Sequence, residues 1–333
     1  MNLIYICDTF YQDGIWLQNQ LGMSSILNPF DLYTIPLDDW ISNLIDFLVD
    51  NFRPVFQAIG EPIRFILETT QSVFVSIPPL IFLVIVGAIA WQFAGVKVAI
   101  YSIMALTVIG FVGTWDEAMV SLSLVVTAVV FCLILGIPLG IVCAKSDAIE
   151  KIIRPLLDVM QTVPTFVYLV PVVMLFGIGE VPGAIATIIF ALPPLIRLTN
   201  LGIRQVPKDV VEAAIAFGSN PTQLLWEAEI PLAMPTILAG VNQAILMALS
   251  MSVITSMIAV PGLGLMVLQG VGRLDVGLAA VGGLGIVLLA IMLDRITQAV
   301  GESNSISWKN RGMIALIRTY VNKKPTKSSG KII

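Results

Sequence analysis

Long apolar stretches between residues 77 and 299, almost free of charged side chains, constrain this chain more than any other feature. A helix needs about 20 predominantly apolar residues to cross the hydrocarbon core of a bilayer. Hydrophobic residues make up 57% of the chain and charged residues only 12%, whereas a typical soluble domain is about one quarter charged. The sequence therefore predicts an all-α integral membrane protein. It argues against a soluble enzyme and against a nucleic-acid-binding protein.

Seven stretches are predicted to cross the membrane. Their approximate ranges are 77–95, 98–114, 118–144, 163–180, 183–203, 236–260 and 276–299. Several contain Pro or Gly, which membrane helices tolerate because neighbouring groups satisfy the freed backbone groups. The second stretch is the shortest of the seven.

The Lys and Arg residues of the connecting segments predict the orientation, since short cytoplasmic loops carry an excess of positive charge. With the N-terminus outside, the inner loops contain Lys97, three basic residues between 145 and 154, and Arg204 with Lys208. The outer loops are mainly acidic. We therefore expect a multi-pass membrane protein with its N-terminus outside and its C-terminus in the cytoplasm.

Charge also divides the chain into three regions. Residues 1–76 hold nine acidic residues against two Arg, a net charge of −7, and form a predicted extracytoplasmic segment. Residues 77–300 form the predicted transmembrane domain. Residues 301–333 form a basic cytoplasmic tail, which contains seven Lys and Arg and one acidic residue. The tail is interpreted as a positive-inside signal, with binding to anionic lipid headgroups as the alternative.

The acidic segment has an amphipathic pattern. From Trp40 to Phe52 apolar residues recur at helical spacing, while the acidic residues lie off this stripe. This pattern predicts a helix lying in the outer membrane interface. Pro62 suits the first turn of a second helix. The two helices would either brace the transmembrane domain or contact an external partner.

The chain lacks the residues that several kinds of catalytic and binding site require. The chain has no His, which excludes His-ligated metals and Ser-His-Asp triads. No charged side chain lies clearly near the middle of a predicted span, Arg197 being the nearest exception, and ion-coupled carriers usually need one. No phosphate-binding G-x-x-x-x-G-K-[ST] loop is present. We expect no catalytic residues, cofactor or metal, and an energy source on another chain. A secondary carrier, a channel or a membrane enzyme is the alternative.

The long inner loop at about 204–235 is predicted to form a helix, a sharp corner and a second helix. Gly218 suits the left-handed residue that ends a helix. Asn220 can cap the next helix, with a Gln three residues later completing a capping box. Pro231 and Pro235 are expected to close the loop before the sixth span.

This loop resembles the EAA loop of permease subunits of bacterial ABC importers. The matching residues are Glu212-Ala213-Ala214, Gly218 and Ile230-Pro231. Ala228 and Ile230 stand where the family has Ile and Leu, and both differences are conservative. The resemblance implies the MetI-like fold of ABC type I importer permeases. It also implies that the loop docks in a cleft of an ATPase through the coupling residues Glu212, Ala213, Ala214, Ile215, Phe217 and Gly218.

The same resemblance implies that the chain lies in a bacterial cytoplasmic (inner) membrane. It also implies the partners of the chain. In this family two permease chains form the path, two ATPase subunits drive alternation, and a binding protein captures the solute outside. Other segments resemble glycine betaine/proline betaine permeases over about residues 28–301. These segments are Pro36–Trp40, Phe52–Gln57, Leu157–Pro171, Phe190–Thr199 and Gly272–Asp275. The implied substrate is glycine betaine or proline betaine, taken up as an osmoprotectant. Choline and carnitine remain alternatives.

The sixth span carries the candidate residues for the lining of the path. Gln243, Met247 and Ser250 fall on one helical face, and Thr255 lies further along. A neutral wall suits a zwitterion such as a betaine, because a fixed charge would trap it. Hydrogen bonding between helices is an equally good explanation of these polar residues.

Overall fold

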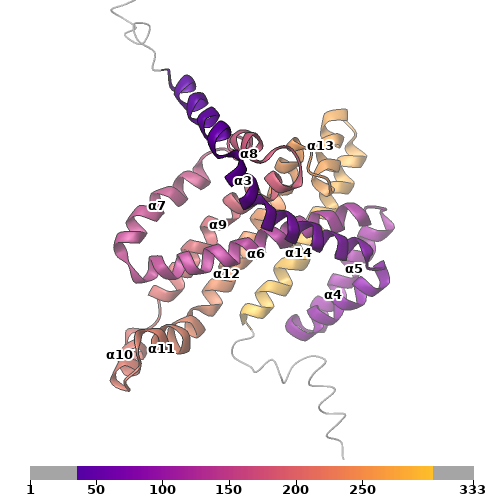
Figure 1. Ribbon diagram of the computed structural model, residues 1–333. Helices are drawn as coiled ribbons and strands as arrows, with labels where there is room; N and C mark the ends of the chain where they lie inside the picture. Colours follow the sequence, from indigo (N-terminus) through magenta and orange to yellow (C-terminus); the bar gives the residue numbers. More distant parts are fainter. Residues whose placement is uncertain (1–35, 303–333) are drawn as a thin grey trace, which may run out of the picture. The chain divides into compact units, whose positions relative to one another are not determined.

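The structure, a computed structural model, describes residues 36–302. Its regular elements are all helical (Figure 1). The chain divides into two compact units between Phe52 and Arg53, which are described separately.

Helix α3 runs from Leu37 to Ser76 and crosses that boundary. Its first part confirms the amphipathic helix predicted from Trp40, with Asp38 and Asp39 in the first turn. Several large apolar side chains of this part are exposed, among them Trp40 and Leu44. Phe47 and Phe52 make an edge-to-face contact with ring centroids 6.1 Å apart.

The prediction that Pro62 starts a second helix is wrong. Both Pro54 and Pro62 lie inside α3, a continuous helix of 40 residues. A proline inside a helix costs about 3 kcal/mol because it removes one backbone hydrogen bond and crowds the preceding turn. The buried side chains of Ile63 and Leu67 in the following turns help to offset this cost.

The second unit continues with eleven α-helices and two short helical turns of other types in the described range. The α-helices are α4 (Pro79–Ala94), α5 (Val96–Phe111), α6 (Trp115–Lys145), α7 (Asp147–Thr162), α8 (Leu169–Phe176), α9 (Glu180–Arg204), α10 (Lys208–Ala216), α11 (Pro221–Gln223), α12 (Ile230–Thr255), α13 (Leu263–Arg273) and α14 (Val276–Glu302). A π-helical turn, Leu224–Glu229, joins α11 to α12, and a 3-10 turn, Ser256–Ile258, follows α12.

Four helical stretches of the described residues are individually long and apolar enough to cross a membrane. They are Trp115–Lys145, Glu180–Arg204, Pro221–Ile258 and Val276–Val300. The pair Leu37–Ser76 and Pro79–Ala94, bent by 110°, raises the number to five if it counts as one broken span. Helix α5 is apolar but only 16 residues long.

A continuous span over 163–180 was predicted, and this prediction is wrong. Helix α7 ends at Thr162, an irregular turn follows, and α8 is only eight residues long. Pro164 explains the break, because its ring disfavours helical geometry at the preceding residue. Gly177 and Gly179 end the segment with φ angles of 94° and 128°. The chain in this region is therefore a broken segment.

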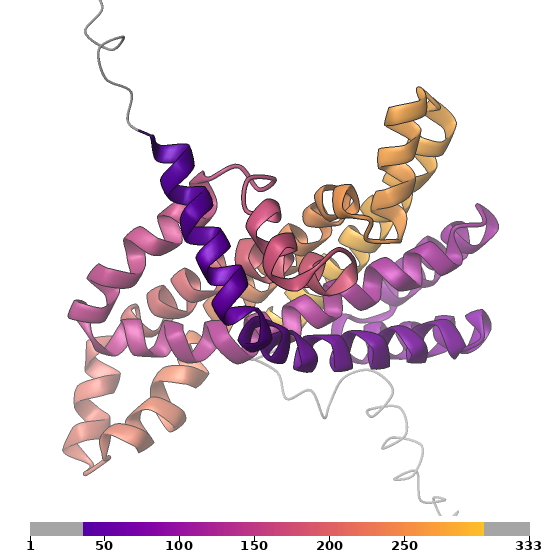
Figure 2. The ribbon, with the colours of Figure 1, turned by 45° about the horizontal axis from the view of Figure 1, so that its top comes forward.

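The core of the second unit is formed where α6, α9 and α12 pack together (Figure 1). Small residues let the helices approach closely. A Cβ atom placed on Gly202 of α9 would lie 3.0 Å from the Cβ of Thr236 in α12. Leu195 and Leu249 are fully buried in the same core. Figure 2 shows α13 beside the first turns of α14, with which it packs.

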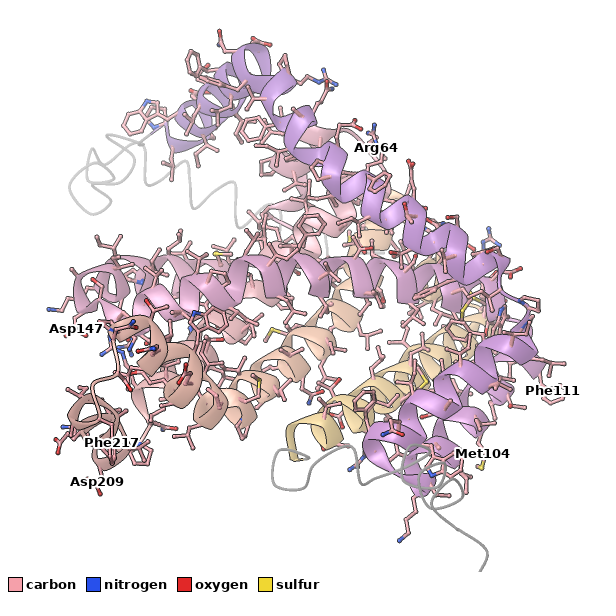
Figure 3. The ribbon with its side chains drawn as sticks, turned by 60° about the horizontal axis from the view of Figure 1, so that its bottom comes forward. Arg64, Met104, Phe111, Asp147, Asp209 and Phe217 are labelled. Atoms are coloured by element: carbon pink, nitrogen blue, oxygen red, sulfur yellow. The ribbon has the colours of Figure 1, made fainter. Side chains whose placement is uncertain are left out.

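Large apolar side chains on α4 and α5 face outwards. Leu80 of α4 and Phe111 of α5 are 77% and 90% exposed. Figure 3 shows Met104 and Phe111 pointing away from the neighbouring helices. Apolar surface of this extent is unusual for a soluble protein. It is the surface expected of helices that contact lipid.

Candidate functional site

The inner loop begins where α9 ends at Arg204, and its first arm is α10. Pro207 immediately precedes α10, with φ −56° and ψ 129°. At the other end of α10, the amide of Ser219 donates to the carbonyl of Ala214 at 3.1 Å. The amide of Gly218 donates to the carbonyl of Ile215 at 2.9 Å. These two bonds form a Schellman motif, with Gly218 in the left-handed conformation at φ 87°.

Asn220 starts the second arm, as predicted. Its side-chain oxygen Oδ1 accepts a hydrogen bond from the amide of Gln223 at 2.8 Å, and its own amide donates to Oε1 of Gln223 at 3.0 Å. This is a complete capping box. The helix–corner–helix prediction is confirmed, because the corner is fixed by local hydrogen bonds on both of its sides.

The predicted coupling residues lie together on this projecting segment. Phe217 is 92% exposed and Ile215 is 56% exposed, while α10 has no buried residue. Glu212 and Ala213 are also exposed, and Ala214 is half-buried. Figure 3 shows Phe217 and Asp209 at the far end of the loop. An exposed aromatic and aliphatic surface on a rigid corner is suited to insertion into a hollow of another protein.

The loop does not close at Pro231 and Pro235, and this part of the prediction is wrong. The helical stretch runs without interruption from Pro221 to Ile258, so the second arm of the loop is the beginning of the α12 span. The π-helical turn ends at Glu229, two residues before Pro231, and the amide of Ile230 donates to the carbonyl of Leu225, five residues earlier. The wider turn accommodates a residue that has no amide hydrogen to donate.

The base of the loop holds ionic contacts that sequence reasoning missed. Lys145, the last residue of α6, pairs with Glu229, the last residue of the π-helical turn. Arg204 pairs with Asp147 at 2.7 Å and with Glu150 at 2.9 Å. In the sequence, Lys145 and Arg204 indicate only the orientation of the chain in the membrane. Nothing in their spacing could have paired Lys145 with Glu229, which is 84 residues away.

A cavity of about 350 Å³ lies between the loop and the ends of α6 and α9. Its wall includes the Lys145–Glu229 ion pair and, from α10, Lys208 and Glu212. The first residue of the EAA-like motif therefore lies at the same cavity as the ion pair.

The candidate path residues of α12 separate into two groups. Gln243 and Ser250 are exposed and Met247 is half-buried, and all three share one face. Thr255 is fully buried, and its hydroxyl donates to the carbonyl of Met251 at 3.0 Å. The structure therefore does not bring Thr255 to the face that Gln243, Met247 and Ser250 share.

Asn242 forms a hydrogen bond between two helices. Its Nδ2 donates to Oδ1 of Asp294 in α14 at 2.6 Å. Within residues 36–302, no group of three or more Cys, Asp or Glu side chains is arranged to hold a metal ion.

Two known proteins that are similar to this chain are both transport permeases. The chain is 54% identical over 297 residues to the glycine betaine/proline betaine transport system permease protein ProW of Escherichia coli K12, covering 88% of this chain and 84% of ProW. It is 47% identical over 273 residues to the glycine betaine/carnitine transport permease protein GbuB of Listeria monocytogenes, covering 81% of this chain and 96% of GbuB.

Among solved structures, an inward-facing MetNI methionine ABC transporter contains a chain with a similar fold. The TM-score is 0.51 at 16% identity, over 55% of this chain and 92% of that chain. This likeness concerns the fold alone.

Residues 136–303 match the family described as the binding-protein-dependent transport system inner membrane component. The match includes the inner loop, α12 and α14, and thus the site described above. The chain belongs to the family of inner membrane components of binding-protein-dependent transport systems.

Proposed function

We propose that this chain is the permease subunit of an ATP-driven importer for glycine betaine and proline betaine. The observation that carries the proposal is the rigid, exposed corner between α10 and α11, on which Ile215 and Phe217 stand clear of their own chain. The similarity to ProW, a glycine betaine/proline betaine permease, and to GbuB, a glycine betaine/carnitine permease, supports betaines as the substrates. ATP hydrolysis takes place on a partner chain, and this subunit is not itself catalytic.

The corner couples the permease to the ATPase. Phe217 and Ile215 fill a cleft of the ATPase, and Glu212 pairs with a basic group beside that cleft. Gly218 lets the chain turn within two residues, because its φ of 87° is strained for other residues. Ala213 and Ala214 let the ATPase surface approach α10 closely.

The assembly contains two copies of this chain and two ATPase subunits, with one corner docked in each ATPase. A betaine-binding protein delivers the solute from outside. The N-terminus lies outside and the C-terminus in the cytoplasm, as the distribution of Lys and Arg favours. Closure of the ATPase dimer moves the two corners together and switches the permease between two states.

The solute moves past neutral side chains. Gln243, Met247 and Ser250 of α12 share a face that carries no charge. Such a face supplies weak polar contacts to a zwitterion without holding either of its charges. The role of these residues in the path is inferred from their position and chemistry.

The test is uptake of radiolabelled glycine betaine at high osmolarity. The chain is co-expressed with its ATPase and binding protein in a bacterium that lacks other betaine uptake systems. We expect energy-dependent uptake that disappears when the ATPase is inactivated and that excess unlabelled proline betaine competes away. Stronger competition by carnitine or choline would reassign the substrate. Uptake that persists without the ATPase would indicate a secondary carrier.

A further inference from the structure

The two residues of the ion pair at the base of the coupling loop, Lys145 and Glu229, differ in their exposure to solvent. The side chain of Glu229 is only 8% exposed, whereas that of Lys145 is 42% exposed. A carboxylate that is removed from water requires a compensating charge or hydrogen bonds. Lys145 supplies that charge, so Glu229 is held to the end of α6.

The two residues stand at the ends of their elements. Lys145 is the last residue of α6, and Glu229 is the last residue of the π-helical turn that leads into α12. The π-helical turn also packs against α10, the first arm of the loop. The pair therefore links α6 to both arms of the loop, although α6 is separated from the loop in sequence by α7, α8 and α9.

The other ion pairs at this end of the unit join different elements. Arg204 of α9 contacts Asp147 and Glu150 of α7, and Arg197 of α9 contacts Asp158 of α7 at 2.7 Å. These pairs hold α7 to α9. Figure 3 shows Asp147 at the same end of the helices as Phe217. The end of α6 also contacts α9, because Arg204 donates to the carbonyl of Cys143 at 2.9 Å, and the last turns of α6 pack against α9 and α12. Among the described residues, the Lys145–Glu229 pair is the ion pair that joins the end of α6 to the second arm of the loop. A movement of the loop therefore reaches α6 through this packing and through the ion pair.

We propose that Lys145 and Glu229 are positioning residues that make α6 move together with the coupling loop. The proposal rests on the proposed function, because it assigns a role within ATP-driven import. The π-helical turn is the compliant part of the second arm, since its backbone differs from the regular helix on either side. The ion pair limits that compliance, so the displacement of Phe217 is passed to α6 and is not lost in the turn.

The first experiment measures betaine imported per ATP hydrolysed. The complete complex of permease, ATPase and binding protein is reconstituted in liposomes. We expect Glu229→Gln and Lys145→Gln to keep the ATPase bound and hydrolysing ATP, and to lower this ratio about tenfold, within the range of coupling free energies between sites. Glu227→Gln is the matched control, because Glu227 is an exposed carboxylate on the same turn.

The reversed pair, Lys145→Glu with Glu229→Lys, is expected to restore the ratio to within about threefold of the original. Full restoration is not expected, because a carboxylate at the C-terminus of α6 opposes the helix dipole. The double substitution of both residues by Met removes the two charges together and leaves no buried charge unpaired. We expect this double-Met chain to assemble and to be uncoupled.

The transport ratio of the variants and the assembly of the double-Met chain can each overturn the proposal. An unchanged ratio in the single variants or in the double-Met chain shows that the link does not transmit movement. A double-Met chain that fails to assemble shows that the pair serves folding instead.

A second measurement does not depend on the substrate. Hydrogen exchange of the permease–ATPase complex is compared with and without ATP and vanadate. We expect residues 140–145 and the loop to change together in the original chain, and the loop alone to change in Glu229→Gln. If the original chain shows this exchange pattern but imports no betaine, the result contradicts the proposed substrate and not the proposed link between α6 and the loop.

Discussion

Thr199 of α9 lies directly against Gly140 of α6. A Cβ atom added to Gly140 would stand 2.5 Å from the Cβ of Thr199 and 3.0 Å from the carbonyl oxygen of Ile196. Thr199 is fully buried, so its side chain has no free space into which it could move. This contact sets the separation between two helices of the core.

Gly140→Ala is therefore expected to destabilise the folded permease by about 1–3 kcal/mol, the usual cost of overpacking a filled core. Thermal unfolding of the purified complex in detergent measures the effect. Gly283→Ala in α14 is the matched control, because a Cβ atom there has no neighbour within 4 Å. Equal unfolding temperatures for the two variants would contradict the close α6–α9 contact.

Gly218→Val is expected to weaken coupling to the ATPase. A β-branched residue is strained at a φ of 87°, at a cost of about 1–2 kcal/mol, and the corner would change shape. Gly218→Asn should retain most of the function, since Asn tolerates this conformation better than other residues. Binding-protein-stimulated ATP hydrolysis is the measurement. No difference between Val and Asn would show that the conformation of this residue is unimportant for coupling.

Asn220→Ala is expected to loosen the second arm of the corner. Losing such a cap costs about 1 kcal/mol, because the amide of Gln223 loses its acceptor. Faster hydrogen exchange of the amides at 222–224 is the measurement. Asn220→Asp keeps an acceptor at the same position and should preserve their protection. If Asn220→Ala leaves the exchange rates unchanged, the capping box does not stabilise the corner.

Phe217→Ala is expected to reduce co-purification of the ATPase without lowering the stability of the permease. Phe217 is 92% exposed, so its truncation removes little packing within the chain. Large aromatic side chains often contribute much of the binding free energy of an interface. Phe111→Ala is the control, because Phe111 is equally exposed but lies on α5 (Figure 3). A similar loss of the ATPase in both variants would argue against docking through Phe217.

The sequence by itself determined the features that depend on neighbouring residues. Gly218 predicted a left-handed corner, and Asn220 with Gln223 predicted a capping box, because the hydrogen bonds concerned span only a few residues. The apolar stretches predicted membrane helices, because their length and composition are properties of consecutive residues. The EAA-like motif identified the loop that projects from the helices.

Only the tertiary structure decided the features that depend on distant residues. The burial of Thr255 and the contact of Gly140 with Thr199 follow from which helices become neighbours. The continuity of helix through Pro62 and Pro231 was not predictable either, because the local penalty of a proline is offset by the surrounding turns and their packing. Lys145 and Glu229 are 84 residues apart, and folding alone brings their opposite charges together in a place where one of them is shielded from water.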